Sequence, residues 1–314
     1  MEFLLDPGQL ADFLSTSLRL SVPIAFAALG GVFAERSGVF NIGLEGMMLA
    51  GAFGAALGAF AFASPYGGLL SGAALSGLGG LLLAVLAVSL GGNQIVSGIA
   101  INLLSLGLTA FLARQIFGLD ATTMRLPGFF PVAIPLLADI PILGPVLFSQ
   151  DPLVYALWLI VPVLWWLMFR TPWGLGIRAI GESPSAADAG GLNVFALRYL
   201  CVVASGVLAG IGGSYLVLSQ VHLFTEHMTA GKGFIALAAL ILGRWNPVGA
   251  LAASLFFGLC DALQLRLQFA NPEVPYQIFI ILPYAASILA LIGFYGRVQP
   301  PAAVGRPYRR EARE

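Results

Sequence analysis

The sequence predicts an all-α protein that crosses a membrane many times. Of its 314 residues, 59% are hydrophobic and 10% are charged, whereas soluble domains carry roughly 25% charged residues. A chain this apolar needs lipid as its solvent, where only helices and closed barrels satisfy every backbone polar group. Its apolar runs are too long and too continuous for barrel strands. The expected fold is a polytopic transmembrane helix bundle of about nine to ten helices, at about 20 residues a span.

Nine apolar segments account for most of the chain, and most are long enough to cross about 30 Å of hydrocarbon as helices. Little sequence remains for a second domain, so residues 1–314 are expected to form a single transmembrane domain. Pairs of glycines spaced for close helix packing support a bundle: Gly54 with Gly58, Gly68 with Gly72, and Gly206 with Gly210. The nine predicted segments are 14–34, 39–63, 67–90, 95–117, 152–169, 199–219, 234–243, 248–267 and 276–295.

Charges near the segment ends predict the orientation. The first twelve residues contain Glu2, Asp6 and Asp12 and no Lys or Arg, so the first segment is expected to be a retained span. With the N-terminus outside and nine spans, ten of the 15 Lys and Arg residues fall on the inner side and five on the outer side. This bias places the C-terminus in the cytoplasm, with 297–314 as a flexible tail. Arg19, inside the first span, must snorkel outward or face a protein partner.

The polar connection 170–198, predicted to be cytoplasmic, contains signals for a short helix. Ser183 is a suitable N-cap and Pro184 a suitable first-turn residue. An Ala-rich stretch follows, and Gly190 with Gly191 would end the helix. The alternative is an ordinary structured loop. The other long connection, 118–151, is Pro-rich and predicted to lie outside, where it could cover a pore mouth or hide a tenth element.

Several polar residues lie where lipid would be expected. Asn41 and Glu45 fall in the second segment, Asn102 in the fourth and Asp261 in the eighth. A charge at the centre of a membrane helix costs at least about 2.5–3.5 kcal/mol on insertion scales. Each residue taken alone would fit a buried hydrogen-bond pair that locks helices together. Taken as a set, they indicate a polar path through the protein.

The seventh segment, 234–243, is too short to span a membrane alone and follows a polar stretch that includes His222 and Thr225. This pattern is typical of a broken helix lining a transport path. The alternative is an outer loop followed by a tilted or re-entrant helix. His222 and His227 are five residues apart and do not form a metal site on one helical face, so no metal is expected.

Motifs for catalysis are missing from the sequence, so we do not expect an enzyme. There is no phosphate-binding loop for ATP, no H-E-x-x-H metal motif and no G-x-S-x-G nucleophile elbow. Cys201 and Cys260 lie in apolar runs and are expected to act as small hydrophobic residues. No cofactor is therefore expected in this chain.

Four stretches stand in a fixed order along the chain: 35–53 (ERSGVFNIGLEGMMLAGAF), 91–102 (GGNQIVSGIAIN), 174–193 (GLGIRAIGESPSAADAGGLN) and 231–249 (GKGFIALAALILGRWNPVG). Together they resemble the permease subunits of bacterial ATP-binding-cassette importers for nucleosides and simple sugars. This group also includes the branched-chain amino acid and ribose permeases. The resemblance covers nearly the whole chain apart from its two ends. The first stretch looks most like the shorter permease of purine-nucleoside importers.

The resemblance implies a permease in the bacterial cytoplasmic (inner) membrane. It implies a second permease subunit, often different, with a cytoplasmic ATPase that binds the ATP and an external solute-binding protein. The helix in 170–198 would then be the coupling helix that contacts the ATPase, and no nucleic acid is involved. A simple sugar or a branched-chain amino acid is the alternative solute, and an ion-coupled secondary transporter is the alternative class. The candidate coupling residues are Gly181, Glu182, Ser183, Ala186, Ala187, Gly190 and Asn193; those of the translocation path are Asn41, Glu45, Asn102, His222, Thr225 and Asp261.

Overall fold

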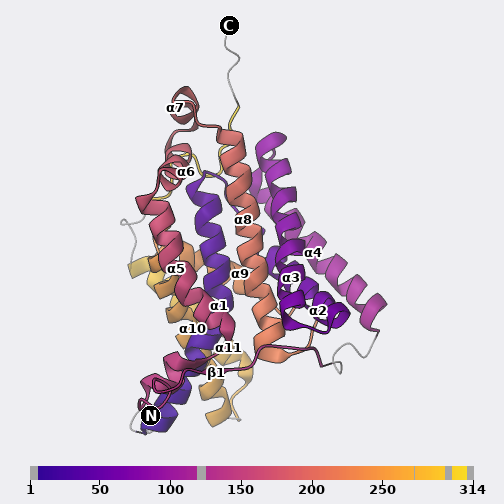
Figure 1. The fold of residues 1–314 in the computed structure, drawn as a ribbon, viewed down its shortest axis with the longest axis vertical. Helices are drawn as coiled ribbons and strands as arrows, with labels where there is room; N and C mark the ends of the chain where they lie inside the picture. The colour runs from indigo at the N-terminus through magenta and orange to yellow at the C-terminus, as the bar shows by residue number, and fades with distance from the viewer. Residues whose placement is uncertain (1–5, 119–124, 272, 294–298, 310–314) are drawn as a thin grey trace.

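The computed structural model describes residues 6–118, 125–271, 273–293 and 299–309, and it is a helical bundle (Figure 1). Seven of its helices are long and apolar enough to cross a membrane, and α9 and the described part of α11 are shorter apolar helices. The predicted all-α polytopic fold is confirmed. The helices that match the nine predicted segments are α1 (Pro7–Arg36), α2 (Leu44–Phe62), α3 (Pro65–Ala84), α4 (Gln94–Phe117), α5 (Pro152–Arg170), α8 (Val194–Tyr215), α9 (Lys232–Leu242), α10 (Pro247–Ala270) and α11 (Tyr276–Gly293).

The remaining elements are short. Two short helices, α6 (Pro172–Glu182) and α7 (Pro184–Ala189), connect α5 to α8. The π-helical turns η2 (Val85–Ser89) and η5 (Leu216–Val221) extend α3 and α8. Between α4 and α5 lie β1 (Val132–Ala133), the π-helical turn η4 (Gly144–Phe148) and β2 (Ser149–Gln150), with β1 and β2 paired antiparallel. In the part of 118–151 that the structure describes, no tenth membrane helix is present.

Local signals in the sequence explain where several helices begin. An asparagine caps α4, α8 and α10, because the side chains of Asn93, Asn193 and Asn246 accept hydrogen bonds from backbone N–H groups of the first turn. Proline lies in the first turn of α1, α3, α5, α6, α7 and α10, where its missing N–H costs nothing.

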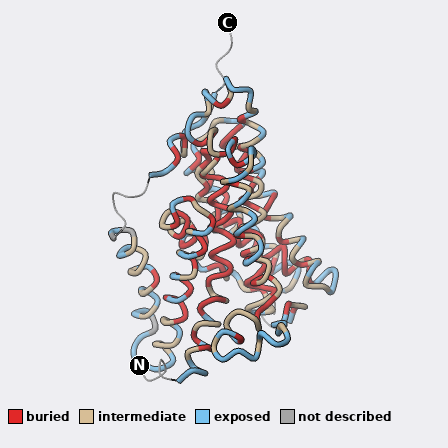
Figure 2. The backbone as a smooth tube through the Cα atoms, turned by 60° about the vertical axis from the view of Figure 1, so that its left-hand side comes forward, coloured by how far each residue is buried: buried red, intermediate tan, exposed pale blue. Residues whose placement is uncertain are grey.

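The centre of the bundle is α1, which packs against α8, α9 and α10. The 18-residue apolar window of α1 is 89% buried, and buried residues concentrate along the middle of the bundle (Figure 2). The helix pairs α2–α3 and α3–α8 pack through the glycines singled out in the sequence: a Cβ at Gly54 would meet Ser71 and Gly72, and one at Gly206 would meet Ser76 and Gly80.

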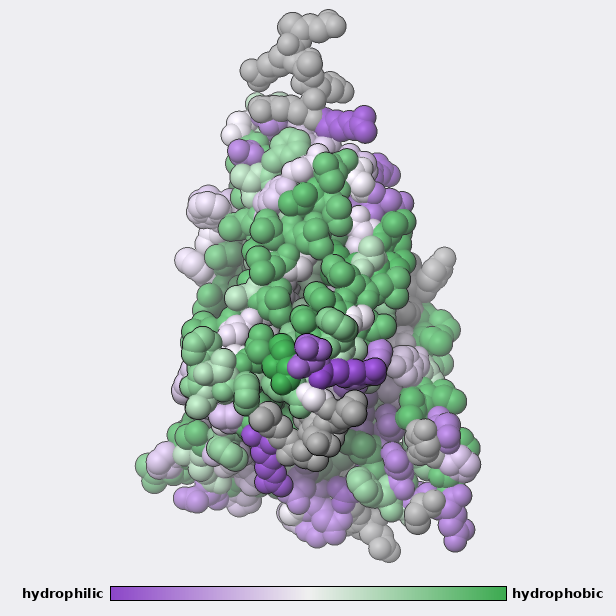
Figure 3. Space-filling view, turned by 90° about the vertical axis from the view of Figure 1, so that its right-hand side faces the viewer, coloured by the Kyte–Doolittle hydropathy of each residue, from purple (hydrophilic) through white to green (hydrophobic). Residues whose placement is uncertain are grey.

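The two ends of the bundle differ. The start of α1 and strand β1 lie at one end, and α6, α7 and the segment 299–309 lie at the other (Figure 1). Figure 3 shows a broad hydrophobic surface between these ends, with hydrophilic residues mainly in its lower part and near its top. This distribution suits a protein whose outer helices contact lipid.

The second membrane segment begins later than predicted, because the chain is not helical between α1 and α2. The predicted segment starts at residue 39, whereas α2 begins at Leu44. Gly38 has a φ of +88°, which favours glycine, and turns the chain after α1. Non-helical backbone at membrane depth needs partners, and side chains supply them: Gln94 Oε1 accepts from Phe40 N at 2.6 Å, and Asn102 Nδ2 donates to Ile42 O at 3.0 Å.

Arg19, the charged residue inside the first segment, contacts the connection between α4 and α5. Its Nε donates to Gln150 Oε1 at 2.9 Å, and its NH2 group lies 3.4 Å from Ser149 O. Gln220 Nε2 in turn donates to Arg19 O at 2.9 Å. The Arg19 side chain therefore contacts the connection between α4 and α5 of its own chain.

Candidate functional site

The connection 170–198 forms two short helices at one end of the bundle. The predicted short helix is present as α7, with Ser183 at its N-cap position, although the Ser183 side chain makes no capping hydrogen bond. Gly190 follows the helix and Gly191 has a φ of +88°. Ala187 is buried with Ile180 and Val194. Ser183, Ala186 and Gly190 are exposed, so one side of α7 is free to contact another protein.

The other candidate coupling residues lie on either side of α7. Glu182 is the last residue of α6, and Asn193 caps α8 by accepting from Ala196 N at 3.0 Å. Gly181 is buried against the end of α1, where a Cβ would collide with Arg36 O. The glycine thus allows α6 to lie directly on α1.

The C-terminal segment packs against this same region, a different arrangement from the flexible tail expected for 297–314. Ala303 is 5% exposed, and its N–H donates to Gly181 O at 2.9 Å. Ala302 N lies 3.3 Å from Glu182 Oε2, and the rings of Tyr308 and Phe195 are 5.8 Å apart. Residues 299–309 are described; 297, 298 and 310–314 of the expected tail lie outside the described residues.

Arg198 joins this C-terminal segment to the break between α1 and α2. The side chain is buried, donates from Nε to Ser37 O at 3.1 Å and from NH1 to Arg306 O at 3.4 Å. The end of α6, the C-terminal segment and the start of the non-helical break therefore share direct contacts.

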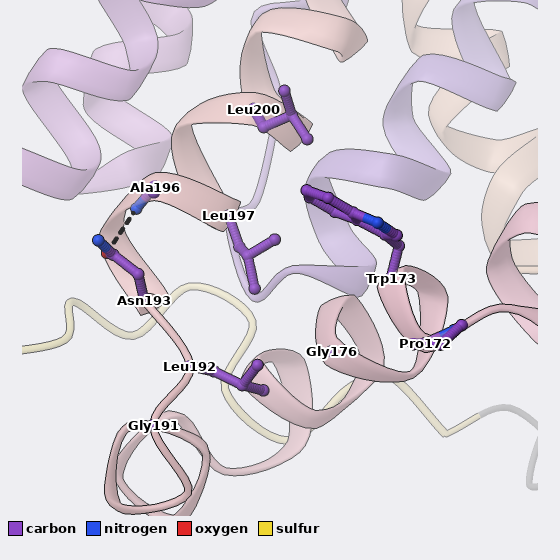
Figure 4. Close-up of a pocket in the computed structure, with 9 residues that line it drawn as sticks. All are labelled: Pro172, Trp173, Gly176, Gly191, Leu192, Asn193, Ala196, Leu197 and Leu200. Carbon is purple, nitrogen blue, oxygen red and sulfur yellow. Dashed lines mark hydrogen bonds between the residues drawn. The ribbon is translucent and has the colours of Figure 1, made fainter.

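A large hollow of about 530 Å³ lies beside α7, between α6 and the start of α8 (Figure 4). Trp173 and three leucines are among its lining residues, and Trp173 is 63% exposed. Its volume would suit a small molecule. Its lining is too apolar to recognise a polar solute, so we do not regard it as a solute site. The lining residues are Pro172, Trp173, Gly176, Gly191, Leu192, Asn193, Ala196, Leu197 and Leu200.

Glu45 holds together the starts of two helices inside the bundle. It lies in the first turn of α2, and its carboxylate also faces the start of α9. Oε1 accepts from Thr229 Oγ1 at 2.6 Å and from Gly231 N at 2.9 Å, while Oε2 accepts from Gly233 N at 2.7 Å. The N–H groups at the start of a helix have no acceptor within the helix, and the Glu45 carboxylate accepts from two of them at the start of α9. Its negative charge also suits the positive end of the helix dipole.

Asn102 and Asn41 support the break next to Glu45. Asn102 Oδ1 accepts from Gly46 N at 2.7 Å, so its amide contacts backbone on both sides of the α2 start. Asn41 is fully buried and donates to Ser205 Oγ at 2.9 Å, while its Oδ1 has no partner among the described residues. Asn41 is thus a buried hydrogen-bond partner and Asn102 a partly buried one, and both lie at the break next to Glu45.

Asp261 joins the same region through Lys232, the first residue of α9. Lys232 Nζ lies 3.3 Å from Asp261 Oδ2, and the two side chains are 18% and 12% exposed. Because Lys232 lies between Gly231 and Gly233 in the chain, the ion pair adjoins the Glu45 cluster. Three of the predicted residues, Glu45, Asn102 and Asp261, thus lie in one region. Asn41 lies next to it, in the break before α2.

His222 lies away from this cluster. Its backbone O accepts from Leu126 N at 2.8 Å, and its ring lies 5.4 Å from that of Phe130, so it contacts the connection between α4 and α5. Thr225 lies three residues further along, in the segment between η5 and α9. Neither joins the Glu45 cluster directly.

The partners that complete the cluster were not among the residues predicted from the sequence. Thr229, Gly231 and Gly233 contribute a hydroxyl and two backbone N–H groups, and Lys232 supplies the cation. The signal was present in part, because a lysine directly before a short apolar segment needs an acidic partner in lipid. Nothing in the spacing identifies Asp261, 29 residues away, as that partner.

Comparison with known proteins identifies the family. A family model described as "Branched-chain amino acid transport system / permease component" matches residues 13–292. The chain belongs to this permease family. A permease component is not itself an enzyme, and the polar cluster described above is part of a transport protein.

Individual relatives within the family are similar along almost their whole length. The chain is 42% identical to the guanosine ABC transporter permease protein NupQ of Bacillus subtilis, over 95% of this chain and 97% of NupQ. It is 38% identical to the nucleoside ABC transporter permease protein NupC of Lactococcus lactis, over 92% and 93%. A putative glucose ABC transporter permease protein, TsgC13 of Haloferax volcanii, is 34% identical over 96% and 98%. No solved structure matches.

Proposed function

We propose that this chain is the membrane-spanning subunit through which an ATP-driven importer moves nucleosides, with purine nucleosides as the leading solutes. The observation that carries the proposal is the 42% identity to a guanosine permease along 95% of the chain. The polar cluster around Glu45 and the Lys232–Asp261 pair supplies hydrogen-bonding groups inside an otherwise apolar bundle. A nucleoside, with its hydroxyl groups and base edge, is a solute that such groups can recognise.

The complete importer, in this proposal, contains three further kinds of subunit: a second permease chain, a cytoplasmic ATPase and an external solute-binding protein. The ATPase would dock on the exposed side of α7. The end of the bundle that carries α6 and α7 then faces the cytoplasm, and the start of α1 lies outside. The distribution of Lys and Arg, ten to five in favour of this inner side, supports that orientation.

Contacts described above supply a physical connection between the ATPase dock and the polar cluster. Gly181 contacts the C-terminal segment, Arg198 joins that segment to Ser37, and the break that starts at Ser37 leads to Glu45. Movement of α6 and α7 by the ATPase would shift the break between α1 and α2. The two helix starts held by Glu45 would then rearrange between outward- and inward-facing states.

The test is uptake of labelled guanosine by proteoliposomes that contain the complete transporter. We expect uptake that requires internal ATP, continues without an ion gradient, and is inhibited by unlabelled nucleosides but not by ribose or leucine. Uptake driven by an ion gradient without ATP would contradict the importer class in favour of a secondary transporter. Absence of guanosine uptake together with ATP-driven uptake of labelled glucose or ribose would move the solute to a sugar, the alternative that the similarity to TsgC13 favours.

A further inference from the structure

A second hollow, of about 340 Å³, lies between α1, α9, α10 and α11. Its size falls in the range of small-molecule sites, roughly 300–1,000 Å³. Unlike the apolar hollow beside α7, it contains the Lys232–Asp261 ion pair in its wall. Gln264 and Tyr284 add an amide and a phenol to the lining.

The polar groups gather on one side of this hollow. Gln264 lies three residues after Asp261 on α10, so the two side chains are neighbours on one helical face. Tyr284 comes from α11 and approaches the start of α9, since its hydroxyl would lie 3.1 Å from a Cβ placed on Gly231. Leu20 and Ile235 are among the apolar residues that complete the wall.

These groups keep unused hydrogen-bonding capacity. The ammonium group of Lys232 has three donors and Asp261 has two acceptor oxygens, while one contact of 3.3 Å joins them. Within the described part of the chain, the Gln264 amide and the Tyr284 hydroxyl have no hydrogen-bond partner. Gln264 is half-buried and Tyr284 is 43% exposed. A polar ligand in the hollow can therefore reach these groups and use their free hydrogen-bonding capacity.

We propose that this hollow is a solute-binding site in which Lys232, Asp261, Gln264 and Tyr284 recognise the base of a nucleoside. The inference rests on the proposed function and locates its solute site. A carboxylate accepts from base N–H groups and an ammonium donates to ring carbonyl and nitrogen acceptors. The pair therefore matches a base edge on which an N–H adjoins a carbonyl, and the Tyr284 ring offers a surface on which a flat base can stack. A sugar has no flat ring to stack in this way.

Gln264→Leu and Tyr284→Phe test the site, because they leave the ion pair in place and so spare the fold. Gln268→Leu is the matched control: it makes the same change one turn further along α10, at a residue that does not line the hollow. The assay is ATP-driven uptake of labelled guanosine by the complete transporter over a range of concentrations. Each test variant should raise KM about three- to tenfold, the effect of losing one neutral hydrogen bond. Stimulation of ATP hydrolysis by unliganded binding protein should stay unchanged.

A second measurement locates the site without using the external binding protein. Photolabelling of the purified permease–ATPase complex with 8-azidoguanosine should modify peptides from α10 or α11, and excess guanosine should prevent it. Wild-type KM in Gln264→Leu and Tyr284→Phe, with labelling elsewhere, would overturn the site while the wild-type uptake still supports the importer. Failure of the wild-type transporter to take up any nucleoside would instead overturn the proposed function.

Discussion

Removing the carboxylate of Glu45 should destabilise the bundle and slow transport together. Alanine at this position leaves the N–H groups of Gly231 and Gly233 without their acceptor, since Glu45 accepts from them at 2.9 and 2.7 Å. An unsatisfied buried donor costs about 1–3 kcal/mol, so the two together cost about 2–6 kcal/mol. That is a large part of a typical total stability of about 5–15 kcal/mol.

Glutamine separates the loss of charge from the loss of volume. Its single oxygen can still accept from Thr229 and Gly231, but its amide nitrogen would face the N–H of Gly233, where Oε2 now accepts. One hydrogen bond to a charged group is lost, which costs about 1.5–3 kcal/mol. The order of stability should therefore be wild type, then Glu45→Gln, then Glu45→Ala.

The measurement is the thermal unfolding midpoint of the purified protein in nanodiscs, paired with ATP-driven uptake at matched membrane levels. Glu226→Gln is the control, because Glu226 also accepts two hydrogen bonds, at 2.6 and 2.8 Å from Arg114, but in a pair whose side chains are 33% and 64% exposed. The control should unfold like wild type, as expected of an exposed ion pair. A wild-type midpoint in Glu45→Ala would refute the reasoning that this carboxylate satisfies the start of α9.

Three further predictions concern the two ends of the bundle. Glu182→Arg combined with Ala186→Trp should abolish ATP-driven uptake at unchanged membrane levels, because Ala186 lies on the exposed side of α7 and Glu182 is an exposed residue just before this helix. Normal uptake would remove α7 from the coupling role. Ala303→Glu places a charge at a 5%-exposed position, so it should lower the amount of solute taken up per ATP hydrolysed. Ala302→Glu, at the exposed neighbouring residue, should leave this ratio unchanged. The same uptake-to-hydrolysis ratio in both variants would show that packing of the C-terminal segment is dispensable. Burial raises the pKa of the Asp151 carboxyl above its ordinary 3.8. Folding thus disfavours the ionised form of Asp151, and the stability of the protein falls as pH rises from about 4 through the raised pKa. Asp151→Asn should therefore raise the thermal unfolding midpoint more at about pH 8 than at about pH 4. An equal change at both pH values would contradict this.

The positions of the membrane helices could be predicted from the sequence because hydropathy is a property of each segment alone. Each of the nine predicted segments overlaps a helix, and the short segment 234–243 is indeed a half-length helix, α9. The error at α2 has a physical cause. Residues 39–43 are apolar enough to continue a span, yet their backbone is satisfied by Gln94 and Asn102 on α4 rather than by helical hydrogen bonds.

The polar cluster around Glu45 was predicted only in part, since its members are joined by tertiary contacts. Glu45, Asn102 and Asp261 stood out because a polar residue in lipid is costly wherever it lies. Their partners could not be inferred in the same way. Thr229 and Gly233 are ordinary residues in sequence, and Ala303 gains its significance from contact with Gly181.

The link between Glu45 and Thr229 has a consequence for how the protein is made. The two residues are 184 positions apart in the chain, and ribosomes add about 5–20 residues per second. Glu45 is therefore synthesised about 10–40 s before Thr229, Gly231 and Gly233, which donate hydrogen bonds to its carboxylate. During this time, we expect the insertion machinery or a membrane chaperone to shield the Glu45 carboxylate of α2 from lipid. Nascent chains stalled before residue 229 should consequently be degraded faster by membrane proteases than chains stalled after α9.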